Sequence, residues 1–200
     1  MIDYDPDSII RIAAKGDGIT ADGRHFPLTA PGDRIGPDGS IVFGVHHVEP
    51  PCRHFPACGG CQIQQLDEES YADFVTGRVV GALAGQGLTP GIVLPPHISP
   101  PMTRRRASLR AARAGNRVTI GVAEEGSHKL IELAMCSVLD PALFALLAPL
   151  RGLLGTILPD KRAAHVRMSI TDQGVDLLLE GVKVQGLSAD EGLGDFARRH

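Results

Sequence analysis

Three of the four cysteines in this 200-residue chain lie close together, between positions 52 and 61. Cys52, Cys58 and Cys61 form the pattern C-x5-C-G-G-C, and the fourth cysteine is Cys136. The N-terminus is acidic, whereas a secretory signal would be basic and then apolar, so clustered thiols indicate metal ligation more than disulfides. The two glycines before Cys61 would let the backbone fold tightly around a bound metal.

Four thiolates suit two kinds of metal site. Tetrahedral zinc is usually held by two C-x2-C pairs, which the spacing from Cys52 to Cys58 and the isolated Cys136 do not supply. A 4Fe-4S cluster commonly combines a local group of three cysteines with one remote cysteine. The spacing therefore favours an iron–sulfur cluster with Cys136 as the fourth ligand. His54 is an alternative to Cys136, and a small buried hydrophobe is the ordinary role of an isolated cysteine.

A basic stretch is hidden within a chain of net charge -3. Residues 104–117 contain six arginines and no acid. Because side chains alternate along a strand, Arg104, Arg106 and Arg110 are predicted to share one face, which would suit contact with the phosphates of a nucleic acid. The alternative is a solvated strand whose arginines pair with nearby acids, namely Glu124, Glu125 or Glu132.

The composition predicts small elements joined by many turns, because the chain has 24 glycines, 15 prolines and no tryptophan. In residues 1–50, short apolar runs alternate with turn signals at positions 8–14, 18–28, 33–35 and 40–48. This pattern predicts a small antiparallel β-barrel of the OB-like class, and an SH3-like or sandwich module is the alternative.

A second domain is predicted over residues 51–187, after the break at Pro50-Pro51. It should be a mixed α/β domain, so the fold class is α+β. The expected elements are a helix over 67–83, a connector over 88–102, strands over 104–113, 117–124 and 129–135, a helix from Asp140-Pro141, and a hairpin of 164–170 with 175–180.

The last segment, 188–200, is predicted to begin a helix. Ser188 and Glu191 have the spacing of a capping box, but no stop signal precedes His200. This segment is expected to be either a frayed terminal helix or an element cut before its end.

At this point the pattern resembles the class I S-adenosylmethionine-dependent RNA uracil-5-methyltransferases, a family that includes bacterial 23S rRNA and tRNA 5-methyluridine enzymes. The resemblance is carried by CRHFPACGGCQIQQL at 52–66, SPPMTRRRASLRAA at 99–112 and ELAMCSVLDP at 132–141. It implies that the N-terminal barrel is a TRAM domain. It also implies that the chain is similar to the branch of the family that carries an iron–sulfur cluster.

For the cluster, the resemblance implies a 4Fe-4S group held by Cys52, Cys58, Cys61 and Cys136. Gln64 matches the glutamine that follows the cysteine loop in this branch. Gln65 departs from the histidine that the family commonly has there, without touching a ligand.

The catalytic Rossmann-like domain of the family has no counterpart in these residues. The sequence contains no D-x-x-C-G-x-G donor loop, no D-P-P-R-x-G segment and no S-C-N nucleophile motif. The resemblance therefore implies the RNA-recognition and cluster-binding part of a longer enzyme, with S-adenosylmethionine needed only by the missing domain. No catalytic residue is assigned, and these 200 residues are expected to be inactive alone.

The expected partner is RNA, rRNA rather than tRNA, and the expected state is a cytoplasmic monomer. No apolar run approaches the roughly 20 residues of a membrane span. The alternative function is a stand-alone zinc-binding module or adaptor that binds nucleic acid. A ferredoxin-like electron carrier is disfavoured, because the barrel and the arginine strand would then have no purpose.

Overall fold

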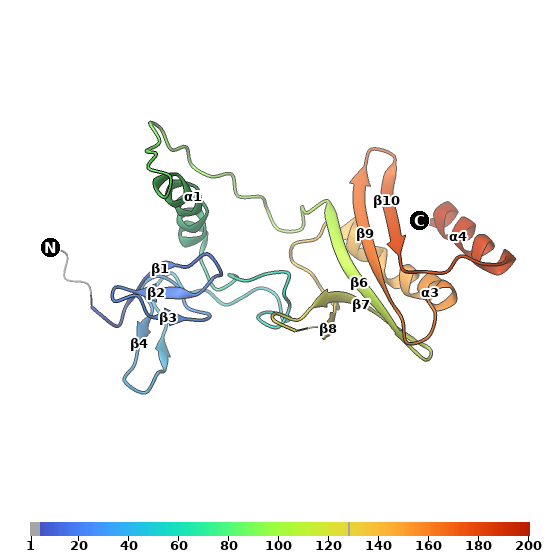
Figure 1. Ribbon diagram of the computed structural model, residues 1–200, viewed down its shortest axis with the longest axis horizontal. Helices are drawn as coiled ribbons and strands as arrows, with labels where there is room; N and C mark the ends of the chain where they lie inside the picture. Colours follow the sequence, from blue (N-terminus) through green and yellow to red (C-terminus); the bar gives the residue numbers. More distant parts are fainter. Residues whose placement is uncertain (1–4, 128) are drawn as a thin grey trace. The chain divides into compact units, whose positions relative to one another are not determined.

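A computed structural model describes residues 5–127 and 129–200 of the chain. The chain divides into two compact units (Figure 1). The first unit comprises Met1–Pro51 and Cys61–Ser99, and the second comprises Cys52–Gly60 and Pro100–His200. This division differs from the predicted boundary near residue 51, because residues 52–60 belong with the second unit, while Cys61 and the helix that follows it belong with the first.

The strands of the first unit are short and form two separate antiparallel sheets. One sheet has the order β1-β2-β3, and the other pairs β4 with β5. Their bounds are β1 Ile9–Ile12, β2 Gly18–Thr20, β3 His25–Phe26, β4 Arg34–Ile35 and β5 Ile41–Val42.

The predicted closed barrel is not what the described residues form. Between β1 and β4 there is an isolated bridge from Ser8 to Arg34, flanked by a 2.8 Å hydrogen bond from the Ile9 amide to the Asp33 carbonyl. Strands of two to four residues, broken by glycine turns, are too short to sustain a continuous ladder around a barrel. The first unit therefore has small antiparallel sheets, as predicted, but these sheets do not close into a barrel.

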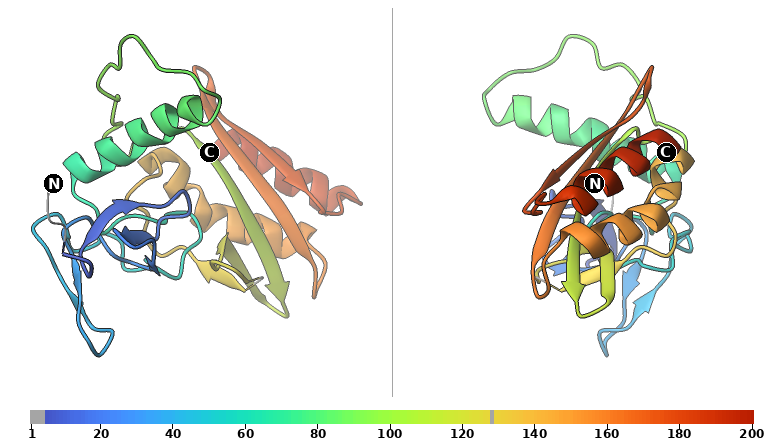
Figure 2. Two further views of the ribbon diagram at one scale, coloured as in Figure 1. Left: turned by 60° about the vertical axis from the view of Figure 1, so that its left-hand side comes forward. Right: turned by 90° about the vertical axis from the view of Figure 1, so that its right-hand side faces the viewer.

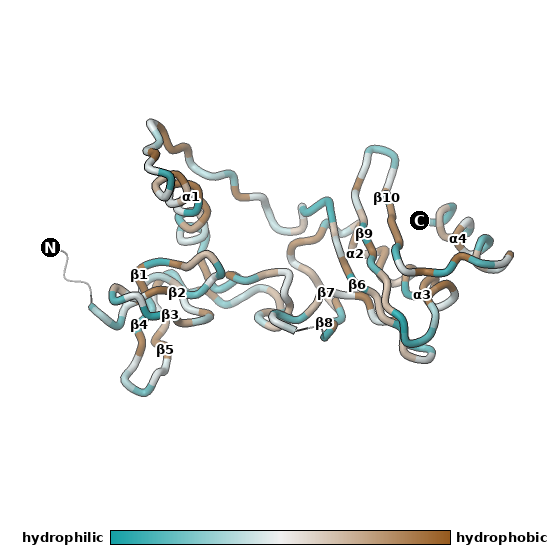
Figure 3. Tube along the Cα trace, viewed as in Figure 1, coloured by the Kyte–Doolittle hydropathy of each residue, from teal (hydrophilic) through white to brown (hydrophobic). Residues whose placement is uncertain are grey.

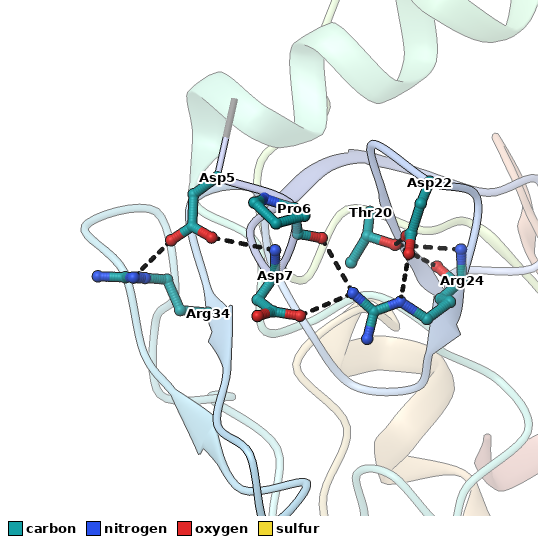
Figure 4. A network of polar contacts seen from close by, with 7 residues as sticks. All are labelled: Asp5, Pro6, Asp7, Thr20, Asp22, Arg24 and Arg34. Atoms are coloured by element: carbon teal, nitrogen blue, oxygen red, sulfur yellow. Dashed lines mark hydrogen bonds and ion pairs between the residues drawn. The ribbon is translucent and has the colours of Figure 1, made fainter. Parts of the chain in front are cut away.

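Polar contacts connect the strands of the first unit at its surface (Figure 4). The Arg24 guanidinium lies 2.7 Å from an Asp7 carboxylate oxygen and 2.8 Å from one of Asp22. The Thr20 hydroxyl donates to Asp22, and Arg34 pairs with Asp5. These contacts join the turn after β2 to the segment that precedes β1, and they join that segment to β4.

The helix α1 (Glu68–Ala84) confirms the helix predicted over 67–83. Its N-terminal cap is Asp67, whose carboxylate accepts a 2.8 Å hydrogen bond from the Ser70 amide. A carboxylate here also interacts favourably with the positive end of the helix dipole. Most of the helix surface is exposed, and Ser70 is its buried residue.

The second unit is built on one five-stranded antiparallel sheet of order β10-β9-β6-β7-β8. The strands are β6 Arg106–Ala114, β7 Arg117–Ala123, β8 Leu130–Glu132, β9 Ala163–Thr171 and β10 Gly174–Glu180. The predicted meander and second hairpin are therefore present. The structure adds the pairing of β6 with β9, which places the hairpin beside the meander.

A leucine-rich core covers one face of this sheet. The short helix α2 (Pro141–Ala145) starts at Asp140, whose carboxylate accepts from the Ala142 amide at 2.9 Å, as the Asp-Pro pair predicts. The helix α3 (Leu147–Ile157) follows, and Figure 2 shows it lying along the sheet. The buried leucines of α2 and α3 pack against alternate residues of β6, β7 and β9, namely Ala107, Leu109, Ala111, Val118, Ile120, Ala164, Val166 and Met168.

The last helix, α4 (Leu187–Arg199), corrects the predicted capping box. Its cap is Gly186 at φ 86°, so Ser188 lies inside the first turn and does not cap it. Glycine takes this backbone conformation without strain, which lets the chain enter the helix two residues earlier than predicted. Among the described residues, no helix has the length and hydropathy needed to cross a membrane.

Candidate metal and RNA-binding residues

The cysteine loop of the second unit is attached to the end of β7. Cys58 forms an isolated antiparallel bridge with Glu124. The Gly59 amide donates to the Ala123 carbonyl at 3.1 Å, and the Glu125 amide donates to the Ala57 carbonyl at 3.2 Å. The loop backbone is therefore held by main-chain hydrogen bonds that do not depend on a bound metal.

His54 connects the cysteine loop to the segment that precedes Cys136. Its Nε2 atom accepts a 3.1 Å hydrogen bond from the Ala134 amide. This bond occupies Nε2, the nitrogen farther from the backbone, so a metal could be bound by His54 only through Nδ1. Cys136 itself accepts a 3.4 Å hydrogen bond at Sγ from the Leu139 amide. Such N–H···S bonds stabilise a thiolate and tune a cluster that it ligates.

The cysteines of the second unit form no disulfide, which leaves their sulfur atoms available as ligands. Cys52, Cys58 and Cys136 carry free thiols. Cys58 lies in the apolar core of the unit, and Cys136 packs against that core. Cys61 follows this segment directly in the chain and is assigned to the first unit.

Two further observations bear on whether these residues fit a thiolate-bound metal. A Cβ atom at Gly59 would lie 2.7 Å from the Ala123 carbonyl oxygen, so the loop can approach β7 this closely only with glycine. The Ser137 hydroxyl, next to Cys136, is buried and has no hydrogen-bond partner among the described residues. A buried hydroxyl is costly without a partner and could donate to a thiolate or sulfide. These surroundings suit thiolates at Cys58 and Cys136, and the assignment of all four cysteines to one iron–sulfur cluster stays a prediction.

The arginine strand presents its basic side chains on the face opposite the helices. Arg106, Ser108 and Arg110 alternate along β6 with three buried residues, Ala107, Leu109 and Ala111. Register places Arg110 beside His165 of β9, and Ser108 beside Arg167. The predicted alternation of basic and apolar residues is therefore confirmed for Arg106 and Arg110.

Arg104 does not share that strand. It precedes β6 and forms an isolated parallel bridge with Leu139, with hydrogen bonds from its amide to the Val138 carbonyl and from the Asp140 amide to its own carbonyl. Regular pairing of β6 with β9 begins at Arg106, so the alternation rule does not fix the face of Arg104, whose backbone pairs with the segment that precedes α2 instead.

Two of the three acids proposed as alternative partners, Glu124 and Glu132, are engaged, and Glu132 pairs with one of the six arginines of residues 104–117. Glu132 pairs with Arg117 at 2.7 Å and with Arg151 at 3.4 Å. Glu124 accepts from the Ser127 hydroxyl, which lowers the pKa of that carboxyl, and lies 3.4 Å from the Lys129 ammonium. In residues 5–127 and 129–200, no ion pair involves Arg104, Arg106 or Arg110. The guanidinium groups of Arg106 and Arg110 are therefore available to an external anion.

A cluster that the sequence did not suggest occurs in the first unit. Ligand-capable atoms of His46, Asp67 and Glu69 lie within 4.8 Å of one another. His46 Nδ1 is 2.7 Å from an Asp67 oxygen, and this hydrogen bond raises the pKa of His46. Asp67 is already engaged as the α1 cap, which accounts for the arrangement. The helix start predicts the role of Asp67, whereas no local pattern predicts that His46 reaches it.

Comparison with known proteins gives this chain a set of relatives. No protein-family model matches it. It is 43% identical over 189 residues to an uncharacterized RNA methyltransferase of Zymomonas mobilis, covering 94% of this chain and 48% of that protein. It is 36% identical over 217 residues to an uncharacterized RNA methyltransferase of Caulobacter vibrioides, covering 96% of this chain and 52% of that protein.

The homologues are named RNA methyltransferases. One of them has a more specific name, the 23S rRNA (uracil(1939)-C(5))-methyltransferase of Pectobacterium atrosepticum, to which the chain is 33% identical over 157 residues. That match covers 76% of this chain and 34% of the Pectobacterium protein. The chain spans about half the length of the first two relatives, so the similarity concerns one part of an RNA methyltransferase.

Proposed function

We propose that this chain is the RNA-recognition and iron–sulfur-binding part of an S-adenosylmethionine-dependent RNA uracil-5-methyltransferase. The observation that carries the proposal is the 43% identity to a protein named an RNA methyltransferase, over 94% of this chain. The uracil-5 specificity rests on the sequence motifs and on the name of the Pectobacterium relative. The methyl donor would be bound by residues outside this chain, and we expect no methyl transfer by these 200 residues alone.

In this proposal Cys52, Cys58, Cys61 and Cys136 hold a 4Fe-4S cluster. The cluster would supply a rigid cross-link rather than redox chemistry. Support comes from the glycine-dependent approach of the loop to β7, and from the His54 bond to the Ala134 amide, which links the loop to the Cys136 segment. All four thiols would then be committed as ligands, leaving none as a catalytic nucleophile.

RNA would lie against the open face of the second unit's sheet. Arg106 and Arg110 supply guanidinium groups that have no acidic partner among the described residues, so they can contact phosphates without first breaking an ion pair. Arg104, just before the strand, would extend the same contact along the backbone. We propose rRNA rather than tRNA as the substrate and a cytoplasmic monomer as the working form.

The RNA part of the proposal is tested by binding of a labelled rRNA hairpin at several salt concentrations. Replacing both Arg106 and Arg110 with Ala should weaken binding and reduce the slope of log affinity against log salt by about one for each phosphate that is no longer neutralised. The matched control replaces Arg198 and Arg199, which lie in the last turn of α4 and carry the same charge. Equal decreases in affinity for the two double variants would show nonspecific attraction and would contradict a binding face on β6.

The metal part is tested by purification without oxygen, followed by iron, sulfide and zinc analysis. We expect brown protein with iron and sulfide, and we expect Cys136→Ser to lose the metal. One zinc per chain without iron, or metal retained in Cys136→Ser, would favour the stand-alone zinc-binding module instead.

A further inference from the structure

An exposed aromatic ring directly after β5 is supported from one side. Phe43 is 66% exposed, although its ring stacks on His47 with centroids 3.8 Å apart and an interplanar angle of 22°. Because one face of the ring is covered while two-thirds of the residue remains exposed, the other face is open to solvent. Figure 3 shows that the arms of the β4–β5 hairpin are hydrophobic and its tip hydrophilic.

The ring beneath Phe43 is held in place by a buried carboxylate. His47 Nδ1 lies 2.7 Å from an oxygen of Asp33, whose side chain is fully buried. The same carboxylate accepts 2.8 Å hydrogen bonds from the amides of Ala30 and Gly44. A carboxylate fixed by two main-chain amides holds the imidazole in one orientation, so Phe43 rests on a fixed support.

The backbone after Phe43 is equally constrained. A Cβ atom at Gly44 would lie 2.5 Å from the carbonyl oxygen of Gly32, so only glycine permits this approach. The His47 amide then donates to the Gly44 carbonyl at 3.3 Å, and the Val48 amide donates to the Gln65 carbonyl at 2.9 Å. Phe43 is thus presented from a short turn that is hydrogen-bonded at both ends.

We infer that Phe43 is a stacking platform for one unpaired base of a single-stranded RNA segment. This inference rests on the proposed function, because RNA is the partner it requires. A flat, preorganised ring with one free face matches the shape of a nucleobase, and every base has a π-face that can use it. Val42 and Val45, which are close to Phe43 in the sequence, are also apolar and exposed.

The platform differs from the arginine face in the physical origin of its affinity. No charge lies in the stack between Phe43 and a base, so its contribution should change little with salt. Contacts of Arg106 and Arg110 with phosphates release counterions, so their contribution should fall steeply with salt. This difference allows the two sites to be distinguished in one titration series.

The decisive experiment uses the absence of tryptophan from the whole chain. Phe43→Trp introduces a single tryptophan at the platform, to be excited selectively and titrated with a uridine-rich oligonucleotide of about ten nucleotides, a length within the range bound by one small ssRNA-binding domain. We expect strong quenching on binding. The matched control is Tyr71→Trp on α1 of the same unit, whose residue is also exposed and whose fluorescence should stay unchanged.

Affinity is measured in parallel by anisotropy of a labelled oligonucleotide. Phe43→Leu keeps an apolar side chain at an exposed position, so it should fold normally. It should lower affinity about 5- to 100-fold, the range for removal of one base–aromatic stack, with an unchanged salt slope. His47→Ala removes the support and should give a smaller decrease in affinity.

Each outcome decides the matter. If the oligonucleotide binds but Phe43→Trp is not quenched and Phe43→Leu binds normally, the platform is wrong and the proposed function stands. If the unmodified chain binds no RNA at all, both are wrong. If Phe43→Leu changes only the sedimentation of the protein, the ring is a contact for a second copy of the chain and the inference is overturned.

Discussion

The two units of this protein are stabilised by different means. The second unit has one long sheet whose apolar face is covered by the leucines of α2 and α3. The first unit has strands of two to four residues, and several of its buried groups are polar, namely Thr20, Thr29, Asp33, Gln65 and Ser70. Burial of apolar area dominates in the second unit, whereas hydrogen bonds to buried polar groups contribute in the first unit. The candidate RNA contacts lie on both.

The largest effect that would test this contrast is expected in the second unit's core. Leu150 of α3 is fully buried, so Leu150→Ala should cost about 2–5 kcal/mol in the free energy of unfolding, because transfer energy is forfeited and a cavity is left. Urea unfolding followed by circular dichroism measures it. Leu187→Ala, at a 73% exposed position of α4, should change little. Similar losses of stability for both variants would contradict a core centred on α3.

In the first unit a single buried carboxylate should matter almost as much. Asp33→Asn keeps the shape of the side chain but replaces one carboxylate oxygen, which is an acceptor, with an NH2 donor. This donor must then face the amide of Ala30 or Gly44, or the ring of His47. We expect stability to fall by about 1–3 kcal/mol, the cost of leaving a buried polar group unpaired. Hydrogen exchange at the Ala30 and Gly44 amides would locate the effect. Unchanged protection of these amides, with the exposed Glu49→Gln variant as reference, would show that the network is dispensable.

A weaker effect is expected from the surface network of Figure 4. Arg24→Ala removes ion pairs with Asp7 and Asp22. Because all these side chains are about half exposed, the urea midpoint should fall less than for Asp33→Asn, and the difference should shrink as salt is added. A salt-independent decrease would mean that Arg24 acts by packing instead of by charge.

The smallest effect is a pH dependence in the first unit. The hydrogen bond to Asp67 raises the pKa of His46 above its usual 6.5. A group whose pKa is higher in the folded state stabilises the fold when the pH is below its pKa in the unfolded state. This stabilisation is lost as the pH rises through the pKa of the folded state. An NMR titration of the imidazole should show the raised pKa, and Asp67→Asn should return it toward 6.5 while still capping α1. An unaltered pKa in Asp67→Asn would disprove the assignment.

The elements of the second unit were predictable because their signals are local. Alternating apolar residues mark β6, β7 and β9, and Asp140-Pro141 marks the start of α2. The capping box at Ser188 failed because Gly186 offered an earlier cap. Arg104 was misplaced because its backbone pairs with residues 138–140, an interaction between segments that are distant in sequence.

The first unit was less predictable because its order depends on contacts between loops. Turn signals located the short strands, but closure of a barrel depends on pairing between β1 and β4, which is reduced to one bridge. The buried Gln65 shows the same dependence, since its side-chain amide donates to the Thr29 carbonyl, 36 positions away in the sequence, at 3.1 Å. Its departure from the histidine of the resembled family therefore falls on a residue that binds another loop.

The sequence by itself determined the residue types available for chemistry: a C-x5-C-G-G-C loop with a distant cysteine, and a run of arginines on a strand. These follow from spacing and from the two-residue period of a strand. Only the tertiary structure decided which arginines face outward without an acidic partner among the described residues, and that Asp33, His47 and Phe43 form one supported ring. Such arrangements depend on long-range hydrogen bonds and burial, which are set by the packing of distant segments and leave no periodic signal in the chain.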